Sequence, residues 1–474
     1  MQGNRTDGAQ TPGAPDPDYL DELGAFAAGL AWKDFEPALR EQVGWILADT
    51  IAAIVGGAPE PEMRALSGAQ PDMPPTVAGA TLIGTGRRVG VDTAALLNGT
   101  AGTFLEMDEG NRFARGHPAI HVIPALIALA ESGEATAEDF VAALVAGYEV
   151  GSRLGSASRL RAAMHPHGTW GTIGAAVACA RLARLDARGM REAINVASSM
   201  TTASSKRTML EGGLVRNVYA GLSNRDGLLA LRLVQAGFTG ERDGPGSLFG
   251  GIVSEHFDRE AAVRGIGSEW HLMQNYFKLH SCCRYNHGAL DAVDAIGARG
   301  GLPAHDRIAS ITVTTYDLAA ELDDPAPRNT LAAKFSVPFA VATRLVNGSS
   351  ALPSFTWEAV RDPAVLALAA KVRVVEDPAM TRRLPLERPA RVEITLDDGR
   401  SVQGEVGVNR GDDAAPYGRD ELRGKFGILA GRVWPASHAG RVLDATLVLA
   451  QEAKGLRAWL DLLRAGPDTT KGAA

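Results

Sequence analysis

Cysteine is scarce in this chain of 474 residues, which contains only Cys179, Cys282 and Cys283. Three cysteines, two of them adjacent, cannot build the disulfide framework that stabilises many secreted domains, because neighbouring cysteines would bridge only through a strained ring. The sequence therefore favours a reducing, cytoplasmic setting.

Long apolar segments and an export signal are also missing from the sequence. The longest uncharged apolar run, near FVAALVAGY, is far shorter than the roughly 18 to 20 residues of a membrane-spanning helix. The first residues, MQGNRTDGAQTPGAPDPDYL, contain no apolar core of the kind found in secretory signals. We therefore expect no membrane insertion and no export.

Positive charge is not in excess either. Lysine and arginine number 48 against 55 acidic residues, so the net charge is −7, which disfavours a nucleic-acid-binding protein. Hydrophobic residues make up 45% and charged residues 22%, as in ordinary soluble proteins. At this length the chain is expected to form two or three domains.

The spacing of apolar residues changes along the chain. From residue 18 to about 270 it is helical, as in EQVGWILADTIAAIVGG, where apolar residues recur every three or four positions before a Gly-Gly stop. After about residue 300, RIASITVTTYD, KVRVVED and RVEITLDDGRSVQGEVGV alternate β-branched and polar residues, and Asp398-Gly399 is a good hairpin turn. This pattern predicts a large helical domain and a small α+β unit that is inserted into it or leans on it.

Histidines occur in two short motifs. His117 and His121 have helical i, i+4 spacing but no glutamate follows the first one, and His165 and His167 form an H-x-H motif that can chelate a metal. Proline follows His117 and His165, which predicts that these histidines stand at helix N-termini, where backbone N–H groups favour anions. The two histidine motifs are therefore consistent with either a metal site or a carboxylate site.

Charged residues near these motifs have two readings as well. The acidic segment with Glu106, Asp108 and Glu109 is either a solvated loop or a partner that holds His117 in one tautomer. Individual lysines and arginines are most often solvated surface charges. Those that are available to complete an anion pocket are Lys206, Arg207, Arg216, Lys278 and Arg284.

Five segments together resemble the MmgE/PrpD family. They are MDEGNRFARGHPAIHVIPALIALAE, GYEVGSRLG, HPHGTWGTIGAAVACARLARL, FKLHSCCRYNHGALDAV and KFSVPFAVATRLVNG, in this order over most of the chain. The family includes 2-methylcitrate dehydratase, cis-aconitate decarboxylase and iminodisuccinate epimerase, which act on small polycarboxylates without a metal or organic cofactor. The resemblance implies such a substrate, no cofactor, no metal and a homodimer with its active site between domains.

The resemblance also implies the fold and its divisions. It is mainly α, with a large all-helical domain formed by both ends of the chain and an inserted, smaller α+β lid domain. We expect the helical domain at 18–274 and 409–466 and the lid domain at 275–408. Residues 1–17 and 467–474 are expected to be disordered tails.

Carried over motif by motif, the resemblance implies a set of site residues. His117 and His165 match the two active-site histidines, and Lys278 matches the lysine at the lid hinge. The family's D-x-D-D-T reads Glu106-Met107-Asp108-Glu109-Gly110 here, without the threonine, and Phe339 stands where many members have tyrosine. The predicted catalytic residues are Lys278, His165, His117 and Asp108, and the predicted substrate-binding residues are Glu109, Arg216, Arg284, His167, Tyr219 and Lys206.

The family's reactions share the need to stabilise negative charge on a carbon beside a carboxylate. Arg216 and Arg284 would hold the substrate carboxylates, and Lys278, with a pKa lowered by burial, would exchange a proton opposite His165. His117 would be oriented by Asp108 or Glu109. The cysteines are interpreted as packing residues, because no thiol-activating pair is visible.

Several functions fit these residues. The leading hypothesis is a cofactor-independent lyase, a dehydratase of a small hydroxy-polycarboxylate. The missing threonine and Phe339 favour the alternative of an epimerase or isomerase of an amino- or imino-dicarboxylate, and a decarboxylase of a cis-aconitate-like acid is a further alternative. A metallohydrolase that uses the H-x-H motif and a non-catalytic carboxylate-binding protein belong to other classes.

Overall fold

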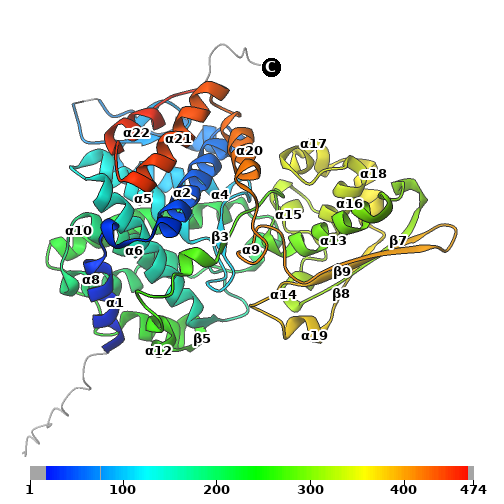
Figure 1. The fold of residues 1–474 in the computed structure, drawn as a ribbon, viewed down its shortest axis with the longest axis horizontal. Coiled ribbons are helices and arrows are strands. Elements are labelled where there is room, and N and C mark those ends of the chain that lie inside the picture. Colours follow the sequence, from blue (N-terminus) through cyan, green and yellow to red (C-terminus); the bar gives the residue numbers. More distant parts are fainter. Residues whose placement is uncertain (1–17, 75, 468–474) are drawn as a thin grey trace, which may run out of the picture.

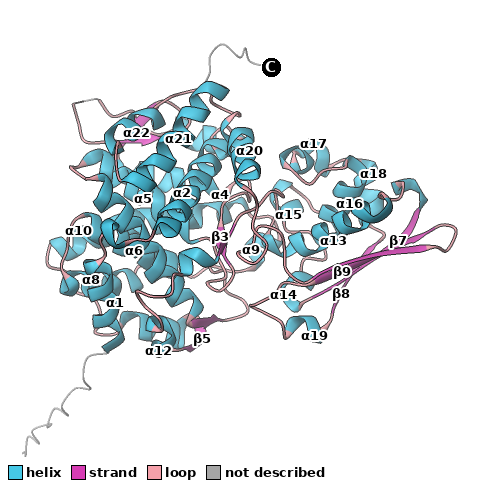
Figure 2. Cartoon of the chain, in the orientation of Figure 1, coloured by secondary structure: helices cyan, strands magenta, loops and turns pink. Residues whose placement is uncertain are grey.

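Two hydrophobic cores organise the chain in the computed structural model, which describes residues 18–74 and 76–467. One core combines residues from both ends of the chain, between positions 19 and 277 and between 417 and 463. The other lies almost entirely between positions 282 and 396. The mainly α fold, with a smaller α+β domain inserted into the helical one, is thereby confirmed (Figures 1 and 2). The exact boundaries at residues 274 and 408 stay predictions.

The helical domain is built from segments before and after the α+β domain, which lie side by side in Figure 1. The tails that were predicted to be disordered, at 1–17 and 467–474, lie outside the described residues except for Pro467. The helices of the helical domain before residue 284 are α1 Asp18–Gly29, α2 Pro37–Gly57, α3 Pro61–Gly68, α4 Val91–Thr103, α5 Pro118–Ser132, α6 Ala137–Ser156, α7 Trp170–Leu182, α8 Ala187–Ser198, α9 Arg207–Leu210, α10 Val218–Gln235, α11 Gly244–Ser247 and α12 Arg259–Val263. The helices after the α+β domain are α20 Arg419–Ala430, α21 Ala436–Glu452 and α22 Leu456–Leu463.

The α+β domain contains a four-stranded sheet with the order β10-β9-β7-β8, in which only β7 and β8 are parallel. From Ile311 to Thr315 of β7, buried residues alternate with partly buried ones, as expected for a sheet with one covered face. Helices α13 and α16 pack against this sheet. Gly399, with a φ of 83°, forms the predicted hairpin between β9 and β10. The elements are α13 Arg284–Gly300, β7 Ile308–Thr315, α14 Asp317–Ala320, α15 Thr330–Lys334, α16 Val337–Asn347, α17 Trp357–Val360, α18 Pro363–Ala369, β8 Val372–Glu376, α19 Pro378–Thr381, β9 Ala390–Leu396 and β10 Ser401–Val406.

Three short ladders occur in the helical domain, one between neighbouring segments and two between segments that are distant in sequence. They are β1 Ala80–Leu82 with β2 Arg87–Val89, β4 Ser158–Leu160 with β5 Ser254–Phe257, and β3 Gly110–Asn111 with β6 Asn275–Tyr276. The last ladder matters for function, because it fixes the acidic loop before β3 against the segment that follows β6. Asp108 and Lys278 therefore become neighbours although 170 positions separate them in the sequence.

Helix α5 begins with His117 at its N-cap and Pro118 in its first turn, as the sequence predicts. A second proline, Pro124, removes one backbone donor inside the helix. Asn224 of α10 compensates, because its amide donates to the carbonyl of Ile120 at 2.8 Å and accepts from the N–H of Ala125 at 2.8 Å. The start of α5 is thus held rigidly against α10.

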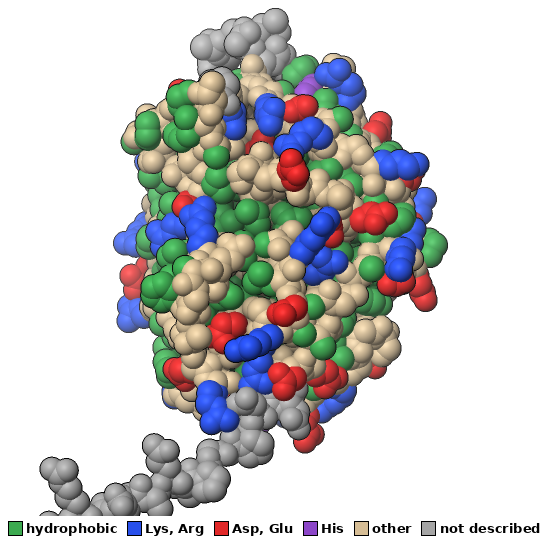
Figure 3. All heavy atoms as spheres, turned by 90° about the vertical axis from the view of Figure 1, so that its left-hand side faces the viewer, with side chains coloured by type: hydrophobic (Ala, Val, Ile, Leu, Met, Phe, Trp, Pro, Cys, Tyr) green, Lys and Arg blue, Asp and Glu red, His purple; other side chains and the backbone are tan. Residues whose placement is uncertain are grey.

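One face of the helical domain is mixed in charge. On the face that Figure 3 shows, acidic and basic side chains are interspersed over the helical domain. Within 18–74 and 76–467, no helix combines the length and the apolar character that crossing a membrane requires. The cellular compartment and the homodimer stay predictions.

Candidate active site

A cavity of about 220 Å³ lies between the two domains. This volume is below the range of roughly 300 to 1,000 Å³ that is typical of sites for drug-sized ligands, so the cavity suits a small acid. The helical domain contributes Glu106, His117, His165, His167 and Arg216 to its lining, and the α+β side contributes Cys283, Arg284, Tyr285, Phe335 and Arg388.

Asp108 lies directly behind this lining and links two of the predicted catalytic residues. Its Oδ2 is 2.9 Å from Nδ1 of His117, and its Oδ1 is 3.5 Å from Nζ of Lys278. Lys278 is completely buried and also lies 3.7 Å from Oε2 of Glu106. The structure therefore brings Asp108, His117 and Lys278 together, with Lys278 behind the lining and next to Glu106.

The charges of this cluster support one another. Burial alone would lower the pKa of Lys278, but the facing carboxylates of Asp108 and Glu106 raise it above its ordinary value. Burial alone would raise the pKa of Asp108, yet His117, Lys278 and Arg216 lower it. The expected lowering of the Lys278 pKa is thus wrong, because burial comes with two carboxylates that favour the charged lysine.

The His117 ring faces Asp108 through one nitrogen. Because Nδ1 lies 2.9 Å from Oδ2 of Asp108, a neutral imidazole with its proton on Nδ1 has its lone pair on Nε2. Of the two orienting residues that the sequence suggests, the structure selects Asp108. Glu109 instead accepts from the backbone N–H of Ala119 at 2.8 Å and from the hydroxyl of Tyr148 at 3.2 Å.

His165 and His167 lie in the loop before α7 and not at its N-terminus. The prediction of a helix start at Pro166 is wrong, because Gly168, with a φ of 91°, turns the chain before the helix begins at Trp170. The His167 ring lies 4.8 Å from the His165 ring and 4.9 Å from the His117 ring, measured between centroids. The loop therefore places three imidazoles in one wall.

The protonation of His165 follows from its contacts. Burial, followed by the charge of Arg216, lowers the pKa values of His165 and His167 well below the ordinary value, so both rings are neutral. The N–H of His167 points at Nδ1 of His165 at 3.1 Å, and the Nε–H of Arg216 points at Nε2 of the same ring at 3.4 Å. A neutral imidazole accepts at one nitrogen only, so each tautomer keeps one of these two hydrogen bonds. His165 and Arg216 therefore form a polar pair in the cavity lining, and the guanidinium group supplies the permanent positive charge of this pair.

The contacts of His165 also disfavour the hypothesis that the H-x-H motif binds a metal ion. One nitrogen of His165 faces a backbone N–H, and the other faces the guanidinium of Arg216, whose charge repels a cation. Arg216 itself forms a buried ion pair with Glu106. Glu106 has a φ of 53°, a left-handed conformation that costs on the order of 1 kcal/mol and places its carboxylate between Arg216 and Lys278.

Two arginines line the opposite wall, and they differ in their partners. Arg284 donates to Oδ1 of Asp412 and to the carbonyl of Arg410, both at 2.9 Å. Arg388 is buried over the ring of Tyr276, and no carboxylate of the described residues pairs with it. Its Nη1 has no hydrogen-bond partner within this part of the chain. Arg388 thus offers a buried positive charge to an anion in the cavity.

The remaining predicted residues lie at the edge of the cavity or behind it. Lys206 lines the rim of the cavity and pairs with Glu321. Tyr219 packs beside His165, with 5.5 Å between ring centroids. The Glu109 carboxyl group lies at the N-terminus of α5. Phe339 is buried in the α+β core against Phe355. The substrate contacts of Glu109 and Tyr219 stay predictions, since neither side chain lines the cavity.

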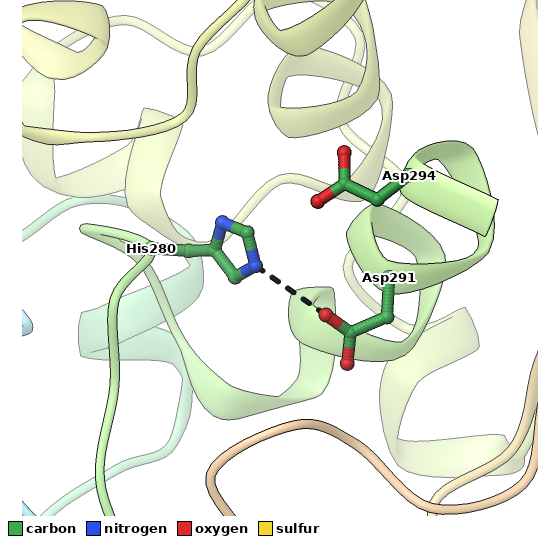
Figure 4. Close-up of side chains that lie close together, drawn as sticks. All are labelled: His280, Asp291 and Asp294. Atoms are coloured by element: carbon green, nitrogen blue, oxygen red, sulfur yellow. Dashed lines mark ion pairs between the residues drawn. The ribbon is translucent and has the colours of Figure 1, made fainter. Parts of the chain in front are cut away.

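The residues around Lys278 include a second polar group, shown in Figure 4. His280 lies 3.5 Å from Asp291 and 2.6 Å from the hydroxyl of Ser350, and Asp294 pairs with Arg344 at 2.7 Å. His280, Asp291 and Asp294 could together approach a metal ion, yet each already has a protein partner. The group ties the Lys278 segment to α13.

Sequence reasoning missed several lining residues. Arg388 belongs to the segment RRLPLERPARV, where no local signal separates one buried arginine from its exposed neighbours. Tyr276 lines the cavity beneath Arg284 and Arg388, and its position depends on the ladder between β3 and β6. Cys283 is also in the lining, and burial raises the pKa of its thiol to about 11, which agrees with an unreactive cysteine.

The fold and the cavity define a two-domain protein in which buried imidazoles and guanidinium groups line a cavity between the domains. The chain matches the MmgE/PrpD N-terminal domain over residues 21–245 and the MmgE/PrpD C-terminal domain over residues 280–451. The protein therefore belongs to the MmgE/PrpD family.

Similar proteins extend over nearly the whole chain. A cis-aconitate decarboxylase-like protein, oryM, of Aspergillus oryzae is 26% identical and covers 94% of this chain and 97% of its own length. The cis-aconitate decarboxylase of Aspergillus terreus is 26% identical over 90% of this chain and 92% of its own. The human cis-aconitate decarboxylase is 24% identical over 86% of this chain and 81% of its own.

Proposed function

We propose that the protein is an enzyme that processes small carboxylic acids, and specifically a lyase that removes water from a hydroxy-polycarboxylate. Membership of the MmgE/PrpD family supports the wider statement. The specific reaction rests on one observation, the contact of Asp108 with both His117 and Lys278. This carboxylate orients a base and is itself kept ionised by a buried ammonium group.

The cavity supplies what an elimination needs. Nε2 of His117 takes the proton from the carbon beside a carboxylate, and Asp108 stabilises the imidazolium that forms. Arg388 and Arg284 hold carboxylates of the substrate, so that negative charge on the neighbouring carbon is delocalised into a group that faces fixed cations.

The groups that contact the leaving oxygen lie in the same wall of the cavity. His165 and Arg216 contact the hydroxyl group as its bond to carbon breaks, and the guanidinium group of Arg216 stabilises the negative charge that develops on the oxygen. The proton that His117 has gained leaves with this hydroxyl as water, so the enzyme returns to its starting state and the product carries a new carbon–carbon double bond. Lys278 contributes its charge from behind Glu106.

Decarboxylation is a second candidate, which the similarity over whole chains to proteins named cis-aconitate decarboxylase favours. In that reaction a carbon–carbon bond breaks, carbon dioxide leaves, and the electron pair on carbon takes a proton. The imidazolium form of His117 would supply it. The two reactions therefore need opposite protonation states of one residue and have opposite pH dependences.

Proton NMR in D2O with citrate-, malate- and aconitate-type acids tests the proposal. We expect new vinylic signals from a hydroxy acid, and we expect their loss in His165→Gln but not in His305→Gln, a matched change at an exposed histidine. Formation of a product with one carboxylate fewer from an unsaturated tricarboxylate would show that the reaction is decarboxylation and not dehydration. Loss of an α-proton signal without a new double bond would indicate an epimerase, and a silent panel would contradict both lyase reactions.

A further inference from the structure

A second cavity, of about 520 Å³, opens at the domain boundary and shares no lining residue with the active cavity. The helical domain forms one side of it, with the loop before α3 and one face of α20. The α+β domain forms the other side, with α15 and the start of α17. Figure 1 shows α20 and α17 facing one another across this boundary.

One side chain in this cavity has an unmatched charge. Lys334, of which 5% is exposed, donates a hydrogen bond from its ammonium group to the carbonyl of Phe104 at 3.5 Å, and no carboxylate of the described residues forms an ion pair with it. The other cation in the lining, Arg432, is already paired with Glu60 at 2.8 Å. The cavity thus carries one uncompensated positive charge.

Burial lowers the pKa of Lys334, and the charge of Arg432 acts in the same direction, while Glu60 and Glu106 oppose it. An anion next to the ammonium group would restore its charged form. This buried lysine therefore favours a negatively charged group at the inner end of the cavity.

The rest of the lining is mainly apolar and open to solvent at its outer end. Phe355 is buried at its base, whereas Trp357 and Ile428 are 42% and 63% exposed. Large apolar side chains with such exposure, on two elements that face each other, suit an apolar group that lies between them.

The cavity lies directly behind the active site. In three segments, close neighbours in sequence line different cavities: Leu105 and Glu106, Ser281 and Cys283, and Lys334 and Phe335. The Ser281 hydroxyl donates to the carbonyl of Leu105 at 2.8 Å, which joins two of these segments. A ligand in the second cavity would therefore contact the supports of the catalytic groups.

We propose that this second cavity binds a monocarboxylate with an apolar body, whose carboxylate pairs with Lys334 and whose apolar part lies between Trp357 and Ile428. One uncompensated lysine matches one carboxylate, and a polycarboxylate would leave further charges against the apolar walls. The site is distinct from the active cavity and does not depend on the reaction proposed above.

Calorimetric titration with octanoate tests this site, with octanol and acetate as probes that lack the charge or the apolar chain. We expect saturable binding of octanoate and binding of the two other probes that is weaker by at least about tenfold. Lys334→Met should weaken octanoate binding to a similar degree. Lys371→Met is the matched control, since Nζ of Lys371 also donates to a carbonyl, that of Ile308, but lies outside the cavity.

A second pair of variants keeps the test informative if Lys334→Met does not fold. Ile428→Asp places a negative charge in the cavity at an exposed position, and it should abolish octanoate binding by repulsion. Val448→Asp introduces the same charge at a helical position that is 42% exposed and lies outside the cavity, and it should bind as the unmodified protein does.

Hydrogen exchange measured on the octanoate-bound protein locates the ligand without any enzyme assay. We expect protection at residues 330–335 and 352–358. Protection of residues 160–168 instead would place octanoate in the active cavity and overturn the proposal. The proposal would also be overturned if octanol bound as tightly as octanoate, or if Ile428→Asp bound octanoate as tightly as the unmodified protein. It would be overturned as well if self-association of the protein closed the cavity and excluded octanoate.

Discussion

The helical wall of the active cavity carries His117, His165 and His167, whose charge depends on their neighbours, whereas the α+β wall carries Arg284 and Arg388, whose charge is permanent. The imidazoles contact one another, a buried carboxylate and a guanidinium group. The two arginines lie over the ring of Tyr276, with distances of 4.7 and 5.4 Å from guanidinium carbon to ring centroid. In the function proposed above, the helical wall transfers protons and the α+β wall binds the substrate carboxylates.

The division also explains why the site needs two domains. Proton transfer requires groups whose pKa values are set by rigid surroundings, and the core of the helical domain provides these. Carboxylate binding requires cations that meet the substrate when the domains enclose it. Each variant below changes one wall and leaves the other intact.

The largest effect is expected on the helical wall. Asp108→Asn removes the charge that orients His117 and stabilises its imidazolium form, so kcat should fall by about 10² to 10⁴ with little change in KM. Glu109→Gln is the matched control, because burial raises the pKa of Glu109 to about 8 and the carboxyl group is already neutral at pH 7. Steady-state kinetics of both variants measure the changes in kcat and KM. An equal fall in kcat for Asp108→Asn and Glu109→Gln would contradict the proposed role of Asp108.

A change on the α+β wall should have the opposite signature. Arg388→Gln removes a buried guanidinium group whose Nη1 has no partner among the described residues, so KM should rise by roughly 10- to 100-fold, as expected for the loss of a charge-assisted hydrogen bond, while kcat changes little. Arg391→Gln, at a partly exposed arginine of β9, serves as control and should leave both constants unchanged. A fall in kcat with constant KM for Arg388→Gln would move this arginine to the chemical step.

The pH dependence of stability tests the supports of the helical wall. The folded state keeps Glu109 protonated up to about pH 8, whereas the unfolded chain ionises it from about pH 4.5, so folding loses stability as the pH rises through this window. Glu109→Gln removes that loss and should gain up to ~1.4 kcal/mol per pH unit relative to the unmodified protein.

Chemical denaturation at several pH values gives these free energies of unfolding. Glu138→Gln, at an exposed position in the first turn of α6, should show the same pH profile as the unmodified protein. A parallel profile for Glu109→Gln would mean that the Glu109 carboxyl group is ionised in the folded protein at neutral pH.

The smallest effect is expected at the rim. Lys206 pairs with Glu321, which is largely exposed, so the pair contributes about 1 kcal/mol or less. Lys206→Gln should change KM by about fivefold or less and leave kcat as it is. A larger rise in KM, measured beside Arg388→Gln, would extend carboxylate binding to the helical side of the rim.

Local features of the fold were predictable because they depend on near neighbours in the sequence. The apolar spacing of α2, the N-cap at His117 and the hairpin turn at Gly399 were all predicted. The helix start at Pro166 was predicted wrongly, since the same His-Pro pattern occurs there without the helical continuation that follows His117.

The site was predictable only in part. His117, His165, Arg216 and Arg284 line the cavity as expected, and Asp108 orients His117 as one of two alternatives. The sequence by itself determined which residue types are present, the helical and strand periods and the resemblance that groups these motifs, because these properties belong to short segments.

Only the tertiary structure decided how these groups act. The ladder between β3 and β6 places Lys278 beside two carboxylates, which raise its pKa when burial alone would lower it. Packing of the two domains leaves Arg388 as a buried cation without an acidic partner among the described residues. Charge in a protein interior depends on which distant residues meet there, and this information lies in the fold and not in any single segment.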